Sequence, residues 1–479
     1  MNGCHKFVII ISQPGGAEAS RSHFCLTRNN ITAICVTKSA ENFEFNDEAI
    51  IEPDSARRRT ETHDNNSRLT LKMSPELLNR TGSSQMTEEQ KIAIDRALIA
   101  PRPRRKRSST QEFVHRLFEE ADIRLNGHRP FDIQVRDPRF YERVLTDGPL
   151  GFGEAYTEGW WDCHDMAEMI ARITRHDIEK NLKLSWKLLW GVLRSRLVNL
   201  QSRSRSPTVG RDHYDKTLDA YECMTGKWQA LSCGYWKSAK TLDEAQEAKF
   251  DLICRKLDIS RHDRVLDIGC GFGSFAKFAA EKYGCSVTGI NISPQQAERA
   301  RSNCTGLPVD IVTCDYRDTR HYLSEKKFDK LVSIGMFEHV GNRNFRTYFQ
   351  IANRCLKDDG LFLLHTIGSN ISLHHNDPWF EKYIFPGGLL PSIKQIGAAI
   401  ENVFVMEDWH NFGYDYSLTL NSWYKNFAAA WSGDPNDPFY RMWTYYLLSC
   451  SGYFKARRVQ LWQVVLSKSG HSGGYTSIR

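Results

Sequence analysis

A short buried strand followed by three glycines at alternate positions is the feature of this chain that most restricts its fold. Residues 265–268, Val-Leu-Asp-Ile, are the apolar run of a central parallel strand. Gly269, Gly271 and Gly273 follow, and glycine lets a backbone turn tightly and approach a ligand because no Cβ intervenes. Residues 274–281 then continue with helical periodicity. This order predicts an α/β domain with a ligand site where the strand ends.

The spacing of these glycines indicates the kind of ligand. A dinucleotide-binding loop has the pattern G-x-G-x-x-G, which places a pyrophosphate at the helix N-terminus. Here the pattern is G-x-G-x-G, with Asp267 two positions before the first glycine. It resembles the first motif of class I S-adenosylmethionine (SAM) methyltransferases, whose ligand has a carboxylate, an ammonium and a sulfonium but no phosphate. A glycine-rich turn in another kind of doubly wound domain is the less favoured interpretation.

The next segment supports a doubly wound sheet. Residues 286–291 are predicted to form a second strand, and Ser293-Pro294 opens a helix over 295–303 as cap and first-turn proline. Strand, helix and strand at this spacing predict a right-handed βαβ unit. Many methyltransferases have an acidic residue at the end of the second strand to hold the ribose hydroxyls, whereas this chain has Asn291.

Further segments resemble successive signatures of cyclopropane-fatty-acyl-phospholipid synthases. Downstream of the glycine loop they are SIGMFEHVG (333–341), LLHTIG (363–368), YIFPGG (383–388), EDWHNFG (407–413) and QLWQVV (460–465). Upstream they are GEAY (153–156) with GWW (159–161), HYD (213–215) and SCGYW (232–236). The resemblance extends over residues 112–468. It implies an α/β fold, a class I SAM-methyltransferase, Rossmann-like doubly wound sheet with a smaller N-terminal domain, and a SAM-dependent C-methyltransferase activity.

Composition shifts divide the chain into four segments. Residues 1–110 are polar and charged, end in the basic block 101–107, and are predicted to be a poorly ordered extension. Residues 111–175 are predicted to form a small lipid-associated domain, in which Trp160-Trp161 serves packing. Residues 176–211 are predicted to form an amphipathic helix, Leu182 to Leu197, and a basic linker. The catalytic domain is expected over 212–479.

Composition also limits the partners. No apolar run reaches the roughly 18 residues of a membrane-spanning helix. The 13 cysteines lack C-x-x-C pairs and zinc spacing, so we expect a reducing cytoplasm, no disulfide framework and no metal site. The formal charge is +7, but no DNA- or RNA-reading motif is present. An anionic phospholipid membrane surface, bound peripherally, suits the lipid substrate that the resemblance implies better than a nucleic acid does. We also expect a homodimer.

The basic linker offers one possible contact with that membrane. Its arginines are either a solvated tether or a surface that pairs with lipid phosphates, and the two interpretations are equally favoured. They are Arg194, Arg196, Arg203 and Arg205.

The chemistry implied by the resemblance defines the catalytic residues. A cis double bond of an acyl chain attacks the methyl carbon of SAM, and closing a cyclopropane ring then requires a base to remove a proton from the delivered methyl group. The family uses a bound bicarbonate as that base. The residues that match its pocket are Cys233, Glu338, His365, the backbone of Ile367, and Tyr416. Cys450 matches a cysteine often assigned to the family's active site, but alkene methylation needs no thiolate and we expect it to serve packing. We expect Tyr235 and Phe337 to stabilise the cation with their ring faces.

The resemblance also assigns a SAM site. Asp267 is expected to orient the ligand or the loop, the glycines to line its amino-acid end, and Ser232 to lie near its carboxylate. Residues 291–296 are expected to reach the ribose, and residues 315–317 the adenine. The expected set is Ser232, Asp267, Gly269, Cys270, Gly271, Gly273, Asn291, Ser293, Gln295, Gln296, Asp315, Tyr316 and Arg317.

Two departures from the family pattern leave three hypotheses open. The family has tyrosine where this chain has Leu231, and a Leu-Gly-Asn sequence where it has Lys216-Thr217-Leu218, which removes polar groups near SAM. The first hypothesis is cyclopropanation of unsaturated phospholipid acyl chains. The second is acyl methylation without ring closure. The third is a degenerate lipid-binding protein without activity.

Overall fold

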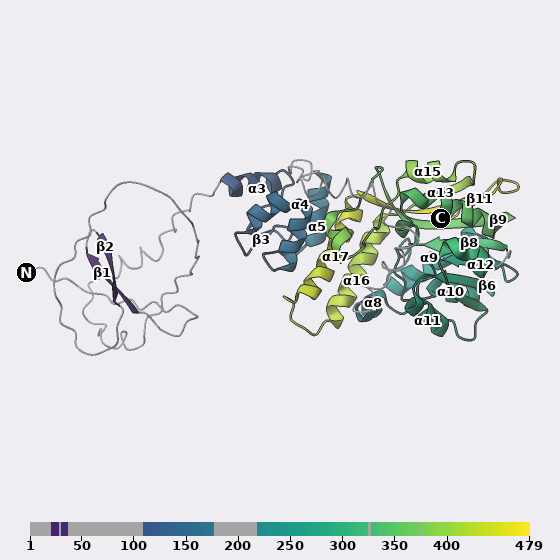
Figure 1. The fold of residues 1–479 in the computed structure, drawn as a ribbon, viewed down its shortest axis with the longest axis horizontal. Helices are drawn as coiled ribbons and strands as arrows, with labels where there is room; N and C mark the ends of the chain where they lie inside the picture. The colour runs from purple at the N-terminus through teal and green to yellow at the C-terminus, as the bar shows by residue number, and fades with distance from the viewer. Residues whose placement is uncertain (1–20, 28–29, 37–108, 177–217, 324–326, 374) are drawn as a thin grey trace, which may run out of the picture. The chain divides into compact units, whose positions relative to one another are not determined.

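The computed structural model of the chain describes residues 21–27, 30–36, 109–176, 218–323, 327–373 and 375–479 (Figure 1). The chain divides into two compact units, Met1–Arg105 and Lys106–Arg479. In the first unit, β1 (Arg21–Thr27) and β2 (Asn30–Val36) pair as an antiparallel hairpin. The rest of the predicted extension, the basic block 101–107 and the predicted helix and linker of 182–211 lie outside the described residues.

The second unit begins with a small helical domain. It contains α3 (Ser109–Glu119), β3 (Gln134–Val135), α4 (Phe140–Thr157), β4 (Trp161–Asp162) and α5 (Met166–Arg175). Trp161 is fully buried, stacks on Phe152 at a centroid distance of 4.4 Å, and donates its indole N–H to the Phe152 carbonyl at 3.0 Å. Trp160 packs under the guanidinium groups of Arg139 and Arg143. The predicted packing role of Trp160-Trp161 is confirmed.

The larger part of the second unit is a seven-stranded sheet. Its order is β10-β11-β9-β8-β5-β6-β7, with β9, β11 and β10 pairing antiparallel and the other neighbours parallel. The strands are β5 (Arg264–Ile268), β6 (Ser286–Asn291), β7 (Val309–Thr313), β8 (Phe328–Ile334), β9 (Leu356–Ser369), β10 (Val405–Asn411) and β11 (Val459–Ser467). The chain leaves β5 toward β7 and returns to β8 on the other side of β5. This reversal places a crevice at the carboxyl ends of β5 and β8.

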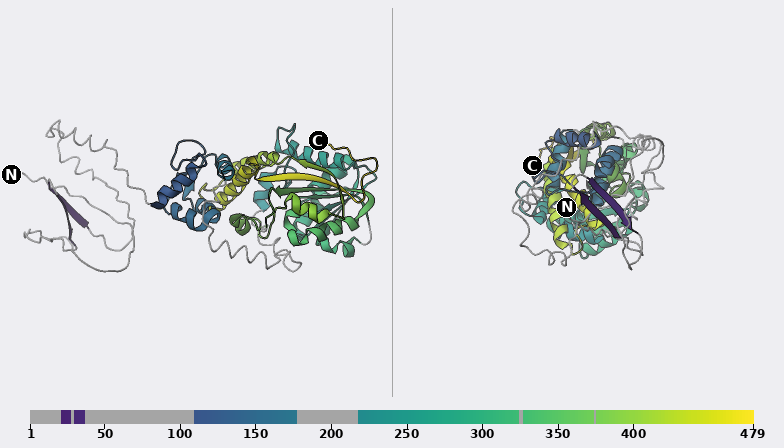
Figure 2. Two further views of the ribbon diagram at one scale, coloured as in Figure 1. Left: turned by 90° about the horizontal axis from the view of Figure 1, so that it is seen from above. Right: turned by 90° about the vertical axis from the view of Figure 1, so that its left-hand side faces the viewer.

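Helices cover both faces of the sheet, as Figure 2 shows around the yellow strand β11. Successive side chains of β5 point to opposite faces: Val265 packs with α9 and α10, and Leu266 with α13 and α15. The helices and short 3₁₀ turns are α8 (Leu218–Thr225), α9 (Leu242–Lys256), α10 (Ser274–Tyr283), α11 (Pro294–Asn303), η2 (Tyr316–Asp318), α12 (Thr319–Tyr322), η3 (Phe337–His339), η4 (Asn342–Asn344), α13 (Phe345–Cys355), α14 (Pro378–Tyr383), α15 (Ile393–Ile400), α16 (Tyr414–Ala430) and α17 (Pro438–Lys455). The strands predicted over 265–268 and 286–291 and the helices predicted over 274–281 and 295–303 are confirmed.

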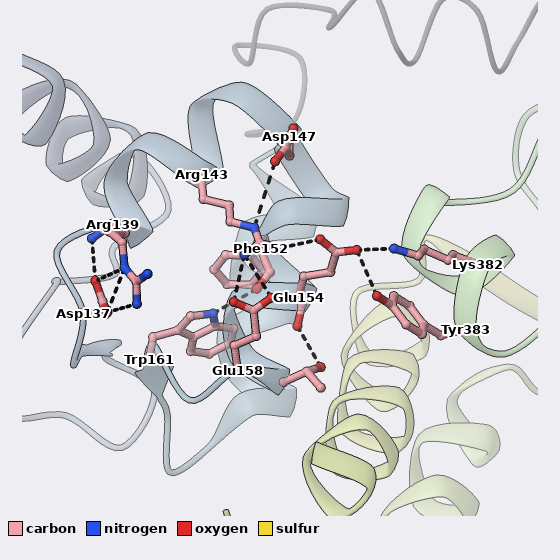
Figure 3. Close-up of polar contacts among 12 residues, drawn as sticks. Asp137, Arg139, Arg143, Asp147, Phe152, Glu154, Glu158, Trp161, Lys382 and Tyr383 are labelled. Atoms are coloured by element: carbon pink, nitrogen blue, oxygen red, sulfur yellow. Dashed lines mark hydrogen bonds and ion pairs between the residues drawn. The ribbon is translucent and has the colours of Figure 1, made fainter. Parts of the chain in front are cut away.

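Two connections join the small domain to the rest of the second unit. The helix α17 packs against α4 and α5, and its buried Arg441 donates to the carbonyls of Tyr156 and Trp161 at 2.6 and 2.8 Å. Glu154 of α4 accepts hydrogen bonds from Lys382 and Tyr383 of α14 at 2.7 and 2.9 Å (Figure 3). The chain that follows α14 lines the cavity described next. The small domain therefore supports one wall of that cavity.

Candidate active site

A cavity of about 330 Å³ opens at the carboxyl ends of β5, β6 and β8. One part is lined by the glycine loop and the ends of β5, β6 and β7, and another by residues from α8, α16 and α17 and the segment after α14. The predicted site residues that line it are Ser232, Asp267, Gly269, Cys270, Gly271, Asn291, Ser293, Gln296, Asp315, Tyr316, Arg317, Glu338, Ile367 and Tyr416. The structure thus brings most of the predicted residues to one cavity.

The glycine loop is held open toward the cavity by the end of β6. Gly271 has a left-handed φ of 54°, and a Cβ built on it has nothing within 4 Å, because that direction faces the cavity. The Asn291 side chain donates to the Gly271 carbonyl at 3.0 Å and to Gln296 at 3.1 Å, and its oxygen accepts the N–H of Ser293. The asparagine at the usual acidic position therefore fixes the glycine loop relative to α11.

Two members of the predicted SAM set lie elsewhere. A Cβ on Gly273 would meet Cys304 and Ala300 at 3.1 and 3.2 Å, so this glycine allows α11 to pack closely. Gln295 is exposed on the first turn of α11 and does not line the cavity. Gly271 and Gln296 line the cavity, whereas their near neighbours Gly273 and Gln295 do not, and the spacing of the motif did not predict this difference.

Asp267 is the acidic group at the base of the cavity. Its side chain is 1% exposed, and neither carboxylate oxygen has a hydrogen-bond partner within the described residues. Burial raises the pKa of Asp267 to about 7, although the charge of the nearby Lys249 acts in the opposite direction. A carboxylate in this state gains most from a cationic ligand group that completes its hydrogen bonds.

Residues 315–317 form the cavity wall beyond β7. Asp315 caps η2 by accepting the N–H of Arg317 at 2.9 Å, and its carboxylate also pairs with the Arg317 guanidinium. The buried ring of Tyr316 packs edge-on against Tyr348 at a centroid distance of 5.3 Å. These contacts fix a polar pair and an aromatic ring beside the cavity.

Glu338 is the second buried acid of the cavity. Its Oε1 accepts the backbone N–H of Ile367 at 2.7 Å, whereas its Oε2 has no partner among the described residues. Burial raises the pKa of Glu338 to about 7, and the Ile367 N–H lowers it in part. Tyr416 of α16 is buried and lines the same cavity. The Ile367 N–H therefore holds Glu338 and is not itself open to a ligand.

His365 lies on β9, two residues before Ile367, and does not itself line the cavity. It is 1% exposed, its Nδ1 lies 3.3 Å from the Gln463 side-chain nitrogen, and its Nε2 has no partner among the described residues. Burial holds the pKa of His365 well below its usual value, so the ring is neutral. An amide that donates to Nδ1 leaves the proton on Nε2, which is then a hydrogen-bond donor.

The two predicted cysteines are thiols in packed surroundings. Cys233 is fully buried, donates to the Gly234 carbonyl at 3.1 Å, and accepts a long contact from Thr419. Cys450 lies on α17, packed against the apolar core, and does not line the cavity. Burial raises the pKa of both thiols, so neither is a thiolate at neutral pH.

The aromatic residues of the cavity are only partly those that the sequence predicted: Tyr316 and Tyr416 line it, whereas Phe337 and Tyr235 do not. Phe337 points into the core, stacked on Phe345 at 4.3 Å, and Tyr235 packs edge-on against Phe412 at 5.2 Å. Neither lines the cavity, so this geometry gives no support to the cation-stabilising role predicted for them, which stays a prediction. The aromatic rings that line it are Tyr221, Phe250, Phe272, Phe275, Tyr316, Phe385, Tyr416, Trp423 and Tyr446. The seven-residue spacing of Tyr416 and Trp423, which places both on one helix face, is the signal that the sequence contained.

Comparisons with known proteins agree with this geometry. A family model described as "Mycolic acid cyclopropane synthetase" matches residues 201–464. The cyclopropane-fatty-acyl-phospholipid synthase of Escherichia coli (strain K12) is 46% identical over 363 residues, which are 75% of this chain and 94% of that protein. A sphingolipid C9-methyltransferase of Komagataella phaffii is 32% identical over 304 residues, 58% of this chain and 62% of that protein.

Two solved structures are similar to parts of this chain. Coclaurine N-methyltransferase bound to N-methylheliamine and SAH (S-adenosylhomocysteine) matches with a TM-score of 0.52 and 21% identity, over 66% of this chain and 98% of that chain. The cyclopropane synthase MmaA2 from Mycobacterium tuberculosis matches with a TM-score of 0.48 and 26% identity, over 55% and 98% of the two chains. The predicted fold class, the α/β fold of class I SAM methyltransferases, is confirmed.

Proposed function

Because the chain belongs to the mycolic acid cyclopropane synthetase family, as its signatures predicted, we propose that it converts cis double bonds of phospholipid acyl chains into cyclopropane rings. The observation that best supports this function is one cavity with a SAM-type glycine loop at one end, a buried carboxylate, Glu338, and a lining of aromatic rings. A neutral alkene reacts only where water is excluded and a cation is tolerated, and aromatic faces satisfy both conditions.

The residues fit SAM. The open face of Gly271 gives room for close approach, and the unpartnered oxygens of Asp267 match an ammonium group. Ser232 lines the same region, and residues 315–317 provide a ring and a polar pair for the adenosine part. When bound, SAM supplies an electrophilic methyl carbon. Leu231 lines the cavity in place of the family's tyrosine and has no side-chain hydrogen-bonding group. The polar contacts with SAM at this end of the cavity therefore come from Ser232 and Asp267.

The reaction balances with one methyl group transferred and one proton released. The double bond attacks the methyl carbon while the sulfur–carbon electron pair leaves with sulfur, so that a carbocation forms on the acyl chain. A base then removes a proton from the delivered methyl group, and the freed C–H electron pair closes the ring. The rings of Tyr416 and Trp423 line the space in which this cation forms, and both are held by α16.

The polar residues next to this space fit a bicarbonate ion, which supplies the base when it is bound. Glu338 Oε2 and His365 Nε2 are buried and have no partner among the described residues, which is costly unless a ligand satisfies them. Ionised Glu338 can accept the hydroxyl proton of bicarbonate, and the N–H of His365 and the hydroxyl of Tyr416 can donate to its oxygens. Cys233, whose thiol already donates to Gly234, serves packing beside this group.

We further propose that the enzyme reaches its substrate by binding the membrane surface. Among the described residues, no helix is long and apolar enough to span a bilayer. Basic residues near an anionic surface contribute about 1 kcal/mol each, so replacing the four linker arginines by glutamine should weaken co-sedimentation with anionic vesicles. Equal co-sedimentation at low salt would exclude the linker as the docking surface. A homodimer stays a prediction.

Product analysis of the purified protein tests the proposed function. The protein is incubated with SAM that has a fully deuterated methyl group and with vesicles of unsaturated phospholipid, and the fatty acids are analysed by mass spectrometry and proton NMR. Cyclopropanation leaves two of the three deuterium atoms in a ring methylene. A branched methyl group that retains all three would support methylation without ring closure. The absence of both product and SAM binding, the latter measured by calorimetry, would support a degenerate lipid-binding protein.

A further inference from the structure

A buried lysine lies behind the cavity and has no role in the site described so far. Lys249 is on α9, is 0% exposed, and does not itself line the cavity. Its ammonium donates to the Ser232 hydroxyl oxygen at 2.7 Å and lies 4.1 Å from the centre of the Phe250 ring. It has no carboxylate within ion-pair distance in the described part of the chain. Burial lowers the pKa of Lys249 to about 7, so its charged form is costly unless a further group compensates the charge.

The hydrogen bond to Ser232 determines what that serine offers to the cavity. An ammonium has only donors, so the Ser232 oxygen is the acceptor in this contact. The hydroxyl proton of Ser232 is then available to donate to another group. Ser232 lines the cavity, and Gln246, one turn before Lys249 on α9, fixes the Ser232 carbonyl with a hydrogen bond of 2.9 Å. The helix α9 thus holds Ser232 from two sides and presents its hydroxyl as a donor.

A complementary charge lies in the same region. Asp267 lines the cavity, and its carboxylate and the Lys249 ammonium interact electrostatically although they form no ion pair. Both carboxylate oxygens lack partners among the described residues. The cavity therefore has a donor backed by a positive charge and an acceptor with a negative charge at the same end. A ligand with a carboxylate and an ammonium on one carbon matches both.

We propose that Lys249 is a positioning residue for the amino-acid end of SAM: acting through Ser232, it makes this end of the cavity selective for the carboxylate, while Asp267 receives the ammonium. This inference rests on the proposed function. The lysine lies behind the serine, so it stabilises the carboxylate without displacing it from the cavity. The bound ligand in turn compensates the buried charges of Lys249 and Asp267, because its carboxylate and ammonium lie between them.

The test compares two ligands that differ only in the carboxylate. Binding of SAM and of decarboxylated SAM is measured by titration calorimetry for the wild type and for Lys249→Met, which keeps the length of the side chain and removes its charge. SAM should bind about 30-fold more weakly to the variant, whereas decarboxylated SAM should bind within about threefold of its wild-type affinity. The double variant Lys249→Met, Ser232→Ala should lose little more SAM affinity than either single variant, because each substitution removes the same Lys249–Ser232 hydrogen bond.

Lys256→Met provides a matched control on the same helix. Lys256 is also buried, at 1% exposed, but its ammonium contacts Asp408 at 3.3 Å and His410 at 3.2 Å, and none of these three residues lines the cavity. Its replacement should leave the preference for SAM over decarboxylated SAM unchanged. Equal losses for both ligands in Lys249→Met would overturn the inference, as would no loss for either. A wild type that binds neither ligand would instead refute the proposed function.

Discussion

Replacing Asp267 by asparagine should stabilise the ligand-free protein and weaken SAM binding. Asparagine has nearly the same shape but no charge, so it removes the cost of burying an ionised carboxylate that has no hydrogen-bond partner in the described residues. The same carboxylate is the acceptor proposed for the SAM ammonium. Asp267→Asn should therefore raise the stability of the ligand-free protein and lower its affinity for SAM. A variant that merely folds poorly would show lower stability together with the lower affinity.

The magnitude follows from the pKa of Asp267. Burial raises it from 3.8 to about 7, so the folded protein binds this proton more tightly than the unfolded chain does. The stability that the proton provides is complete below pH 3.8 and is lost as the pH rises through about 7. A pKa difference of one corresponds to about 1.4 kcal/mol, so above pH 7 the charged group costs at most ~4 kcal/mol.

Urea unfolding without SAM, repeated between about pH 5 and pH 8, measures this cost. The stability gain of Asp267→Asn should be small at the acidic end, grow with pH, and level off near pH 7. Calorimetry at pH 8 should show that SAM binds about tenfold or more weakly to the variant. A variant that is equally destabilised at every pH, or that binds SAM as the wild type does, would refute the reasoning.

Five further substitutions examine the glycine loop, the base and the Cys450 thiol. Gly271→Val should abolish SAM binding, because the valine side chain would fill the cavity. Gly284→Val is the control: this glycine has a similar left-handed φ of 70° but lies outside the cavity, so its replacement should lower stability without changing SAM affinity. Unchanged SAM affinity in Gly271→Val would show that the SAM site lies elsewhere. Glu338→Gln and His365→Ala should each lower turnover about 10²-fold or more with little change in SAM affinity. Depleting bicarbonate should slow the wild-type enzyme in the same way. Turnover that is unchanged by both substitutions and by bicarbonate depletion would exclude bicarbonate as the base. Cys450→Ser should retain turnover, since burial keeps this thiol protonated, and a loss comparable to that of Glu338→Gln would contradict the packing role.

The sequence predicted the features that depend on local pattern. The apolar run of 265–268, the glycines after it and the Ser-Pro start of α11 each have a direct physical link to a strand, a turn or a helix cap, and the structure has these elements in place. Signatures spread along the chain also predicted the family correctly. Most of the residues assigned to the site meet in one cavity because they follow the carboxyl ends of adjacent strands.

The sequence did not predict what depends on side-chain direction and on distant contacts. Phe337 and Tyr235 lie beside site residues in the sequence, yet both rings point into packed cores, whereas Trp423 and Tyr446 reach the cavity from α16 and α17. The hydrogen bond from Lys249 to Ser232 joins residues 17 positions apart, and no motif contains both. A pattern of residue types shows which face of an element is apolar but not which neighbour that face meets.

Fatty-acid profiling tests the central claim most directly. The full chain is expressed in bacterial cells that make unsaturated phospholipids but no cyclopropane lipids, with Glu338→Gln as the matched inactive control. The proposed function predicts that cyclopropane fatty acids form at the expense of their unsaturated precursors in the wild-type culture and that they are nearly absent from the control. An unchanged profile with normal expression, or methyl-branched acids in place of cyclopropanes, would contradict it.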